Sequence, residues 1–338
     1  MRDPSAAPRP VTLSTDEIAP VWVLDDPFDG GSAQAIGIAE RLGVPHLRVP
    51  LAWRWQARFA GLTRRGSLRG LQTPGWPFTA PRGPALALSG SPRSEAVALW
   101  LRNGFGTRVV HCGMPTRQSK LFDLLIVPRH LRPSKASNVL PVLGLPHRIS
   151  PLVLAQARVA WAGRLSHLPR PLITVLAGGA GAGGGLRVSA ANALGRQVAR
   201  AASSSGGSVL ATTTRQTGVE ATDAFAAGLA PCMHLLYRWG EPGENPYAAM
   251  IALADVVVCT GGSASMVSEA CGGAAPVFIA SLGDDAVHRR LHETLYRAGQ
   301  ARPLTHSVSP WDRTPLDEAG RMATEIRARM SIGPQAVD

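Results

Sequence analysis

The chain has 338 residues, of which 45% are hydrophobic, with 36 Gly and 28 Pro, a composition typical of a globular α/β protein that is long enough for two domains. It contains no uncharged apolar run of 18 or more residues and no N-terminal basic region followed by an apolar core, so we expect neither a transmembrane helix nor a signal peptide. Cys112, Cys232, Cys259 and Cys271 lack CxxC spacing, so we expect reduced structural thiols, no metal site and a cytoplasmic protein.

The formal net charge of +12 is unevenly distributed along the chain. Residues 1–150 carry 19 Lys and Arg against 9 Asp and Glu, whereas residues 151–338 carry 16 against 14. Nearly all of these cations are Arg, which a GC-rich genome also favours, so the isoelectric point by itself says little about partners. The asymmetry indicates that the first half either faces an anionic partner or uses its charge for solubility.

The first half opens with a segment that predicts a βαβ unit. Residues 1–18 are rich in Pro and small polar residues and predict a disordered leader. An apolar run at 21–24 predicts a strand, a glycine turn follows, and helical spacing over 33–42 leads into a second strand at 44–49. The candidates for catalysis or acceptor binding at this first turn are Asp26, Gly30, Gly31 and Gln34.

The stretch from Leu51 to Gly70 combines three aromatic residues with five arginines and has no acidic residue. Trp and Arg together are typical of a segment at the headgroup level of an anionic membrane. An ordinary helix that buries its aromatic side chains and solvates its arginines fits the pattern at least as well, and single-stranded nucleic acid is a weaker alternative. The membrane-contact candidates are Trp53, Arg54, Trp55, Arg58 and Phe59.

Four short apolar runs complete the first half and predict strands at 84–88, 107–111, 124–127 and 138–143. His111 and His130 fall near the ends of two of these strands. A histidine in such a place is a candidate general base, although a lone histidine is more often structural. A helix over 151–161 then crosses to the second half, and residues 166–171 predict a linker.

The second half contains two glycine turns that follow buried strands. Residues 172–177 predict a strand that opens into the glycine-rich run 178–185, and residues 255–259 predict another that ends at Thr260-Gly261-Gly262. Each turn precedes a predicted helix, whose first N–H groups and macrodipole favour an anion. Because ligands bind outside the carboxyl ends of parallel strands, the two turns indicate a site for a diphosphate at one edge of the sheet.

The rest of the second half repeats the same alternation. Further strands are predicted at 208–213, 233–237 and 277–280, and further helices at 286–298 and 311–329. An arginine after a strand can bind phosphate bidentately, and a carboxylate on the helix after the second glycine turn can accept hydrogen bonds from a ribose diol. The donor-binding candidates are Gly178, Gly179, Arg215, Glu244, Asn245, Tyr247, Gly262, Ser263, Ser265, Met266 and Glu269.

These patterns predict an α/β protein with two Rossmann-like domains that face each other across a cleft. The first domain covers residues 19–165 and lies on the acceptor or membrane side, and the second covers 166–333 and binds the nucleotide sugar. That arrangement is typical of a sugar-nucleotide transferase, with histidine and arginine side chains of the first half facing the glycine turns of the second.

Several segments also resemble one known family, namely VWVLDDPFDGGSAQAIGIAERLG, FDLLIVPRH, SNVLPVLGLPHRISP, GENPYAAMIALAD and SASMVSEA. They look like the mitochondrial-fission "elongated mitochondria" family, whose bacterial members are regarded as candidate glycosyltransferases of the GT-B type. The resemblance covers about residues 21–304. The matching positions are Gly30, Gln34, Phe122, Asp123, Pro128, His130, Asn138, Gly178, Gly179, Arg215, Glu244, Asn245, Pro246, Tyr247, Ser263, Ser265, Met266, Ser268 and Glu269.

The chain departs from the family's pattern at three places. Pro27 follows Asp26 where the family usually has Gly, Arg129 stands where an acidic residue precedes the histidine, and Gly261-Gly262-Ser263 replaces an Asp followed by Ser. The resemblance therefore gives less support to an acidic base in the first half.

We expect, on this basis, an enzyme that transfers a sugar from a nucleoside diphosphate sugar to a lipid-linked or envelope-glycan acceptor without a metal or other cofactor. His130 or Asp26 would take the proton from the acceptor, and the protein would lie in the cytoplasm or at the inner face of the cytoplasmic membrane. The alternative is a non-catalytic GT-B adaptor that binds a membrane and recruits a partner, as plant members are implicated in recruiting a dynamin-like GTPase.

Overall fold

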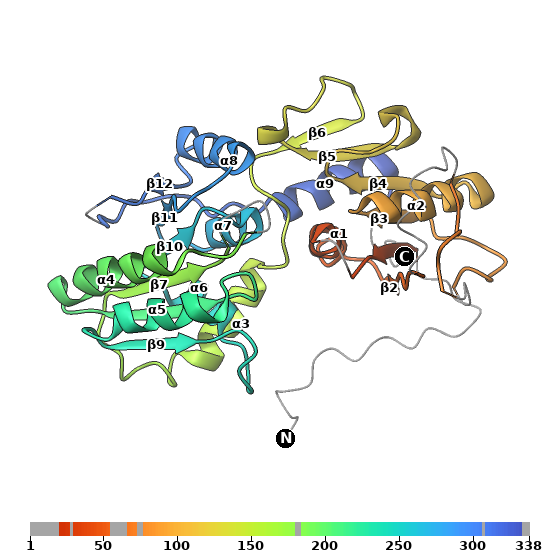
Figure 1. Ribbon diagram of the computed structural model, residues 1–338. Coiled ribbons are helices and arrows are strands. Elements are labelled where there is room, and N and C mark those ends of the chain that lie inside the picture. Colours follow the sequence, from red (N-terminus) through yellow and green to blue (C-terminus); the bar gives the residue numbers. More distant parts are fainter. Residues whose placement is uncertain are drawn as a thin grey trace, which may run out of the picture. The chain divides into compact units, whose positions relative to one another are not determined.

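The computed structural model describes residues 20–27, 30–54, 66–72, 77–179, 184–305 and 308–332. These residues form an α/β fold with two six-stranded sheets and flanking helices (Figure 1). The strand pairings that the structure describes are parallel in both sheets, as expected for strands joined by crossover helices. The predicted α/β class with two parallel sheets is therefore confirmed, whereas the predicted leader lies outside the described residues.

The first sheet has the order β2-β1-β3-β4-β5-β6. Its inner strands β3 and β5 are buried at every position, as in a parallel sheet with both faces covered. Helix α2 begins where Ser91 accepts a hydrogen bond from the Ser94 N–H, and it ends at Gly106, whose φ of 71° suits glycine. The elements are β1 Val21–Asp25, α1 Gly31–Ala39, β2 His46–Pro50, β3 Leu86–Ser89, α2 Pro92–Phe105, β4 Arg108–Cys112, β5 Leu124–Pro128 and β6 Val139–Val142, with short 3-10 helices η2 Ser119–Leu121 and η3 Arg129–Leu131.

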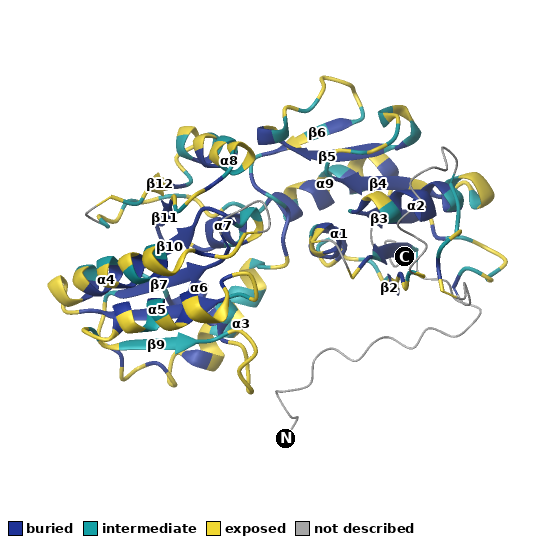
Figure 2. Cartoon of the chain, in the orientation of Figure 1, coloured by how far each residue is buried: buried dark blue, intermediate teal, exposed yellow. Residues whose placement is uncertain are grey.

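The second sheet has the order β12-β11-β10-β7-β8-β9. Alternate residues of its strands face opposite sides: Val175 packs with α4 and α5, whereas Leu176 packs with α6 and α7. Figure 2 shows the inner strands of this sheet buried, the edge strand β9 partly buried, and the outer faces of α4 and α5 exposed. The elements are α3 Pro151–Trp161, β7 Leu172–Ala177, α4 Val188–Ser204, β8 Ser208–Thr213, α5 Val219–Leu229, β9 His234–Tyr237, α6 Tyr247–Leu253, β10 Val256–Thr260, α7 Ala264–Cys271, β11 Val277–Ala280, α8 Ala286–Arg297, β12 Arg302–Pro303 and α9 Glu318–Met330.

The chain divides into two compact units, residues 1–126 with 324–338, and residues 127–323. The last turns of α9 belong to the first unit, where Arg327 Nη1 donates to the Arg41 carbonyl oxygen at 2.8 Å. The predicted boundary at residues 165 and 166 falls between the last strand of the first sheet and the first strand of the second.

The C-terminal helix starts later than its sequence pattern predicts. Residues 311–317 are not helical, and α9 begins only at Glu318. Pro315 lacks an N–H and would clash with the carbonyl four residues earlier in a helix, so the predicted start at Trp311 is wrong. Asp317 then provides the cap, because its Oδ1 accepts from the Gly320 N–H at 3.0 Å.

Candidate functional site

The two glycine turns of the second unit lie side by side at the carboxyl edge of its sheet. Strand β7 pairs in parallel with β10, with Leu176 opposite Cys259. Directly after these residues, the Gly178 N–H donates to Thr260 Oγ1 at 2.8 Å. The chain runs from β7 outward to β9 and then returns to β10, so the turns flank the topological switch point of the sheet, where ligands of α/β proteins bind.

Gly178 allows the β7 turn to rest on the first turn of α7. A Cβ atom at Gly178 would lie 3.0 Å from Met266 Sδ and 3.1 Å from Ser263 Cβ, which is tighter than ordinary packing. Ser263 is the N-cap of α7, and its side chain accepts from the Met266 N–H. The structure therefore brings together Gly178, Ser263 and Met266. Gly262 directly precedes the N-cap, and Ser265 lies in the first turn of α7.

The arrangement presents partial positive charge at this edge. The first N–H groups of a helix have no intrahelical partner, and the macrodipole adds about half an elementary charge at the N-terminus. Ser265 is exposed on the first turn of α7. Residues 180–183 of the β7 glycine run lie outside the described residues. The described part of the site thus suits an anionic group such as phosphate.

The β8 turn closes the other side of Gly179. Thr217 Oγ1 donates to the Ala177 carbonyl oxygen at 2.6 Å and accepts from the Thr214 N–H at 2.9 Å. A Cβ atom at Gly179 would lie 3.1 Å from Gln216 Cβ. Within the described residues, the exposed guanidinium of Arg215 has neither a hydrogen-bond nor an ion-pair partner, so it is free to contact an anion.

Glu269 and Tyr247 form a half-buried pair between α7 and α6. The Tyr247 hydroxyl donates to Glu269 Oε2 at 2.5 Å, and Asn245 Oδ1 accepts from the Tyr247 N–H at 3.0 Å. Burial raises the pKa of the Glu269 carboxyl, while the hydrogen bond from Tyr247 acts in the opposite direction. One carboxylate oxygen is therefore engaged, and the other has no described partner.

Glu244 has a different partner from the other residues of its loop. Its Oε2 lies 2.8 Å from Arg164 Nη1, and both side chains are largely exposed. The Arg164 guanidinium in turn lies 3.6 Å from the centroid of the Trp161 ring. The structure therefore places Glu244 in a surface ion pair, separate from the hydrogen bonds of Asn245, Tyr247 and Glu269.

His130 lies in η3, directly after β5, and is buried. Its carbonyl oxygen accepts from Arg290 Nε of α8 at 3.1 Å, and its Nδ1 has no partner among the described residues. Burial lowers the pKa of His130 to about 4, and the charges of His288, Arg290 and His292 act in the same direction. The imidazole is therefore neutral at pH 7, and its low pKa makes it a weak base.

A contact that the sequence pattern does not reveal holds the second glycine turn. His292 Nε2 lies 2.9 Å from the Gly261 carbonyl oxygen, and its Nδ1 lies 3.7 Å from Asp284 Oδ2. Any Cβ at Gly261 would lie 2.5 Å from both Asp284 Oδ2 and His292 Cε1. The only sequence signal is the spacing of His288 and His292 after the capping Asp285, which fixes one helix face but not its distant contact.

The first-unit candidates gather around the turn after β1. Asp26 is buried, its Oδ2 accepts from Ser91 Oγ at 2.7 Å, and its N–H donates to Ser32 Oγ at 2.8 Å. Backbone atoms of Gly31 and Gly90 approach so closely that a Cβ at Gly31 would lie 1.8 Å from the Gly90 carbonyl oxygen. Asp26 thus links the β1 turn to the cap of α2. Gly30, the N-cap of α1, has open space around it, and Gln34 Oε1 on α1 is buried without a partner in the described structure.

The other predicted residues of the first half are described only in part. His111 lies in β4, 2.9 Å from Ser89 Oγ and 3.5 Å from Glu95 Oε1, and is buried. Trp53 forms an isolated antiparallel bridge with Leu71, and the Arg93 guanidinium lies 5.9 Å from the centroid of its ring. Arg54 is exposed, and three membrane-contact candidates lie outside the described residues, namely Trp55, Arg58 and Phe59.

The described residues form neither a metal-binding cluster nor a membrane-spanning helix. No group of three or more His, Cys, Asp or Glu side chains in the described ranges has a geometry that would hold a metal ion. Among the helices that the structure describes, none combines the length and the hydropathy needed to span a bilayer.

The sequence match to known families covers nearly all of these elements. Residues 29–330 match the model of the family described as Mitochondrial fission ELM1. The chain belongs to this family. The match includes both glycine turns, the Tyr247–Glu269 pair and His130, whereas Asp26 lies just before it.

Similar proteins include a curated relative and several solved structures. "Mitochondrial fission protein ELM1" of Arabidopsis thaliana is 26% identical over 259 residues, which are 66% of this chain and 58% of the relative. MurG of Acinetobacter baumannii is 16% identical with a TM-score of 0.46, covering 94% of this chain and 96% of that one. A UDP-forming alpha,alpha-trehalose-phosphate synthase of Burkholderia xenovorans is 16% identical with a TM-score of 0.34, covering 73% and 70%. Membership of the family therefore rests on the sequence match.

Proposed function

We propose that this member of the family is a metal-independent glycosyltransferase of the GT-B type, which moves a sugar from a nucleoside diphosphate sugar to a lipid-linked or cell-envelope glycan acceptor. The contact between the two glycine turns carries the proposal. Gly178 lies against Ser263 and Met266 at the switch point of the sheet, so two backbone turns and one helix N-terminus meet where a diphosphate can bind.

In this proposal, the donor is held by groups that surround the turns. Gly178, Gly179 and the first turn of α7 receive the diphosphate, and the Arg215 guanidinium, which has no partner among the described residues, contacts a phosphate oxygen. The Glu269 oxygen that has no partner within the described ranges accepts from a ribose hydroxyl, while Tyr247 fixes the orientation of the carboxylate. Preorganised N–H groups and Arg215 stabilise the leaving diphosphate, a role that does not require a metal ion.

The acceptor side of the proposal uses the first half of the chain. His130 takes the proton from the acceptor hydroxyl as an oxocarbenium-like centre develops on the sugar, and its position after β5 with Nδ1 unpartnered among the described residues supports this role. Its pKa of about 4 keeps the imidazole neutral but also makes it a weaker base than an ordinary histidine. Asp26 is the second candidate base, although its carboxylate already accepts from Ser91. The aromatic and basic stretch that includes Trp53 and Arg54 binds the anionic membrane surface carrying the acceptor, at the inner face of the cytoplasmic membrane.

A thermal-shift screen of the purified protein with UDP-, GDP-, ADP-, CMP- and dTDP-sugars tests donor binding. A ligand at 100 times its dissociation constant adds about 2.7 kcal/mol of stability, which shifts the melting temperature measurably. We expect a selective shift that Glu269→Ala abolishes. Glu244→Ala is the matched control, because Glu244 pairs with Arg164 at the surface, and it should keep the shift. A panel in which no nucleotide stabilises the protein would overturn the proposal.

The second candidate function is a non-catalytic adaptor that binds a membrane surface and recruits a partner protein, such as a dynamin-like GTPase. Two observations favour it: the match to a family described by mitochondrial fission, and the engagement of Asp26 by Ser91. An adaptor should bind anionic liposomes equally well after Glu269 and His130 are both replaced by Ala. A wild type that transfers sugar, together with a double variant that binds liposomes equally well but has lost the transfer activity, would instead support the transferase.

A further inference from the structure

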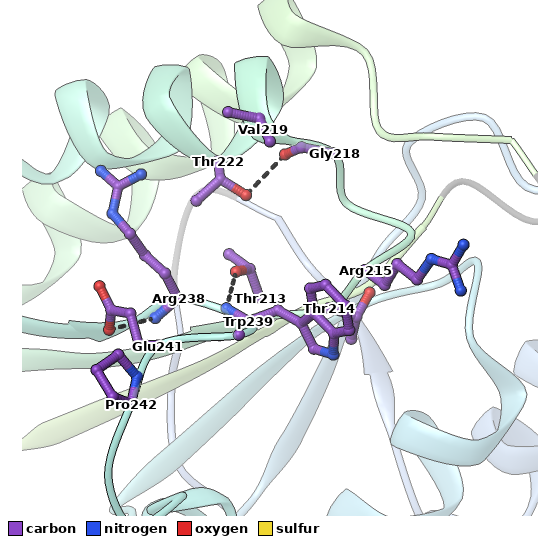
Figure 3. Close-up of a pocket in the computed structure, with 11 residues that line it drawn as sticks. Thr213, Thr214, Arg215, Gly218, Val219, Thr222, Arg238, Trp239, Glu241 and Pro242 are labelled. Atoms are coloured by element: carbon purple, nitrogen blue, oxygen red, sulfur yellow. Dashed lines mark hydrogen bonds between the residues drawn. The ribbon is translucent and has the colours of Figure 1, made fainter.

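A cavity of about 510 Å³ opens beside the glycine turns, between the turns that follow β8 and β9 (Figure 3). One wall is formed by Thr213 and Arg215 at the end of β8, another by the first turn of α5, and a third by the residues after β9. Since β7 pairs with β8 and β8 with β9, the cavity lies on the same carboxyl edge as Gly178 and Gly179, one strand further along the sheet.

Trp239 gives this cavity an aromatic wall. Its side chain is 60% exposed, and it is the one aromatic residue among the exposed large hydrophobic side chains in the described part of the chain. The Trp239 N–H donates to Thr213 Oγ1 at 3.1 Å, so the backbone position is fixed independently of the indole. An accessible indole on a cavity wall is a stacking surface for a flat, partly polar ring.

The two arginines of the cavity differ in their partners. Arg238 Nη1 lies 2.5 Å from Asp223 Oδ1, and the Arg238 N–H donates to Glu241 Oε2. Arg215, by contrast, has no partner within the described residues. Figure 3 shows Arg215 and Arg238 extending to opposite sides of the Trp239 ring. Arg215 lies on the turn after β8, which the hydrogen bond from Thr217 Oγ1 to the Ala177 carbonyl oxygen holds against the end of β7.

We propose that this cavity is the nucleobase subsite, in which the base stacks on Trp239 while Arg215 contacts the phosphates. The inference rests on the proposed function and adds where the base binds. Neighbouring strands are about 4.8 Å apart, so the β9 turn lies about 10 Å from the β7 turn, a separation that the ribose of one nucleotide bridges. The loop before α6 is a poorer platform, because Glu244 pairs with Arg164 and Asn245 accepts from the Tyr247 N–H.

The test compares nucleoside diphosphates with inorganic pyrophosphate on the full-length protein. Dissociation constants are measured by calorimetry for UDP, GDP, ADP, CDP and pyrophosphate with wild type, Trp239→Ala, Trp239→Phe and Arg215→Ala. Loss of one base–aromatic stack corresponds to a rise of about 5- to 150-fold in the dissociation constant of the tightest nucleoside diphosphate. Trp239→Ala should leave pyrophosphate binding unchanged, Trp239→Phe should largely restore nucleotide binding, and Arg215→Ala should weaken both ligands.

Leu152→Ala is the matched control, since Leu152 is 66% exposed on α3 and does not line the cavity. Its affinities should equal those of wild type. Nucleoside diphosphate binding that Trp239→Ala leaves unchanged would overturn the subsite and leave the proposed function standing. If Trp239→Ala weakened pyrophosphate binding as much as nucleotide binding, the subsite would also be overturned, because Trp239 would then not act on the base. A wild type that binds none of the nucleotides would overturn the proposed function and the subsite together.

Discussion

Replacing His130 with Gln tests whether the protein holds this imidazole neutral. His130 is buried in η3 against α8, and burial lowers its pKa from 6.5 to about 4. The unfolded chain therefore binds a proton on His130 at pH values where the folded chain does not. The stability that this histidine contributes is present in full above pH 6.5 and is lost as the pH falls from 6.5 to about 4.

The size of the effect follows from the pKa difference. A shift from 6.5 to about 4 corresponds to a loss of about 3 kcal/mol of unfolding free energy across that pH range. Gln cannot titrate. Between pH 7 and pH 4, the unfolding free energy of His130→Gln should therefore fall by about 3 kcal/mol less than that of wild type, whatever the stability of the variant at pH 7. His292 contributes to the remaining slope in both proteins, since burial also lowers its pKa.

Urea unfolding at several pH values measures this difference, and the change of free energy with pH is compared within each protein. A histidine-labelled NMR titration gives a second readout, in which the His130 resonance should not titrate above about pH 5. Identical pH dependence of wild type and His130→Gln, or a His130 resonance that titrates near pH 6.5, would refute the reasoning.

Three further substitutions test the contacts that shape the site. Thr260→Val removes the acceptor of the buried Gly178 N–H and should lower the unfolding free energy by about 1–3 kcal/mol. The control Thr294→Val loses only a hydrogen bond within α8 and should lower it less. Equal losses would contradict the role of Thr260. Gly261→Ala should destabilise the protein by roughly 1–3 kcal/mol because its Cβ overlaps Asp284 and His292. Gly104→Ala, which has open space inside α2, should stabilise it slightly. Denaturant unfolding that ranks the two variants the other way would contradict the close contact of Gly261 with Asp284 and His292. Tyr247→Phe should raise the dissociation constant of the bound nucleotide several-fold by releasing Glu269, and an unchanged constant in calorimetry would exclude Tyr247 as its positioning residue.

The sequence predicts the elements whose signals are local. The strand over Leu172–Ala177 is a continuous apolar run that is buried on both faces, and its predicted bounds match the structure. Helix α3 was equally predictable because Ser150 and Pro151 mark its start. The predicted helix over 311–329 began too early because it ran through Pro315, and β12 is only two residues long.

The candidate site is predictable only where neighbouring strands define it. The proximity of Gly178 to Thr260 follows from two βα units at one sheet edge, and it is confirmed. The contact of His292 with Gly261 joins residues 31 positions apart, and no periodicity encodes it. The exposed Trp239 was not among the predicted site residues for a related reason, since the sequence of a loop does not show whether its tryptophan is exposed.

Hydrogen exchange with and without the tightest-binding nucleoside diphosphate is the most direct test of the diphosphate site. If the two glycine turns bind the diphosphate, the nucleotide should slow exchange in peptides that contain Gly178 and Gly179 and in peptides that contain Ser263 to Met266, while peptides from α3 stay unchanged. Protection confined to other parts of the chain, or none under saturating nucleotide, would contradict the assignment of this edge as the donor site.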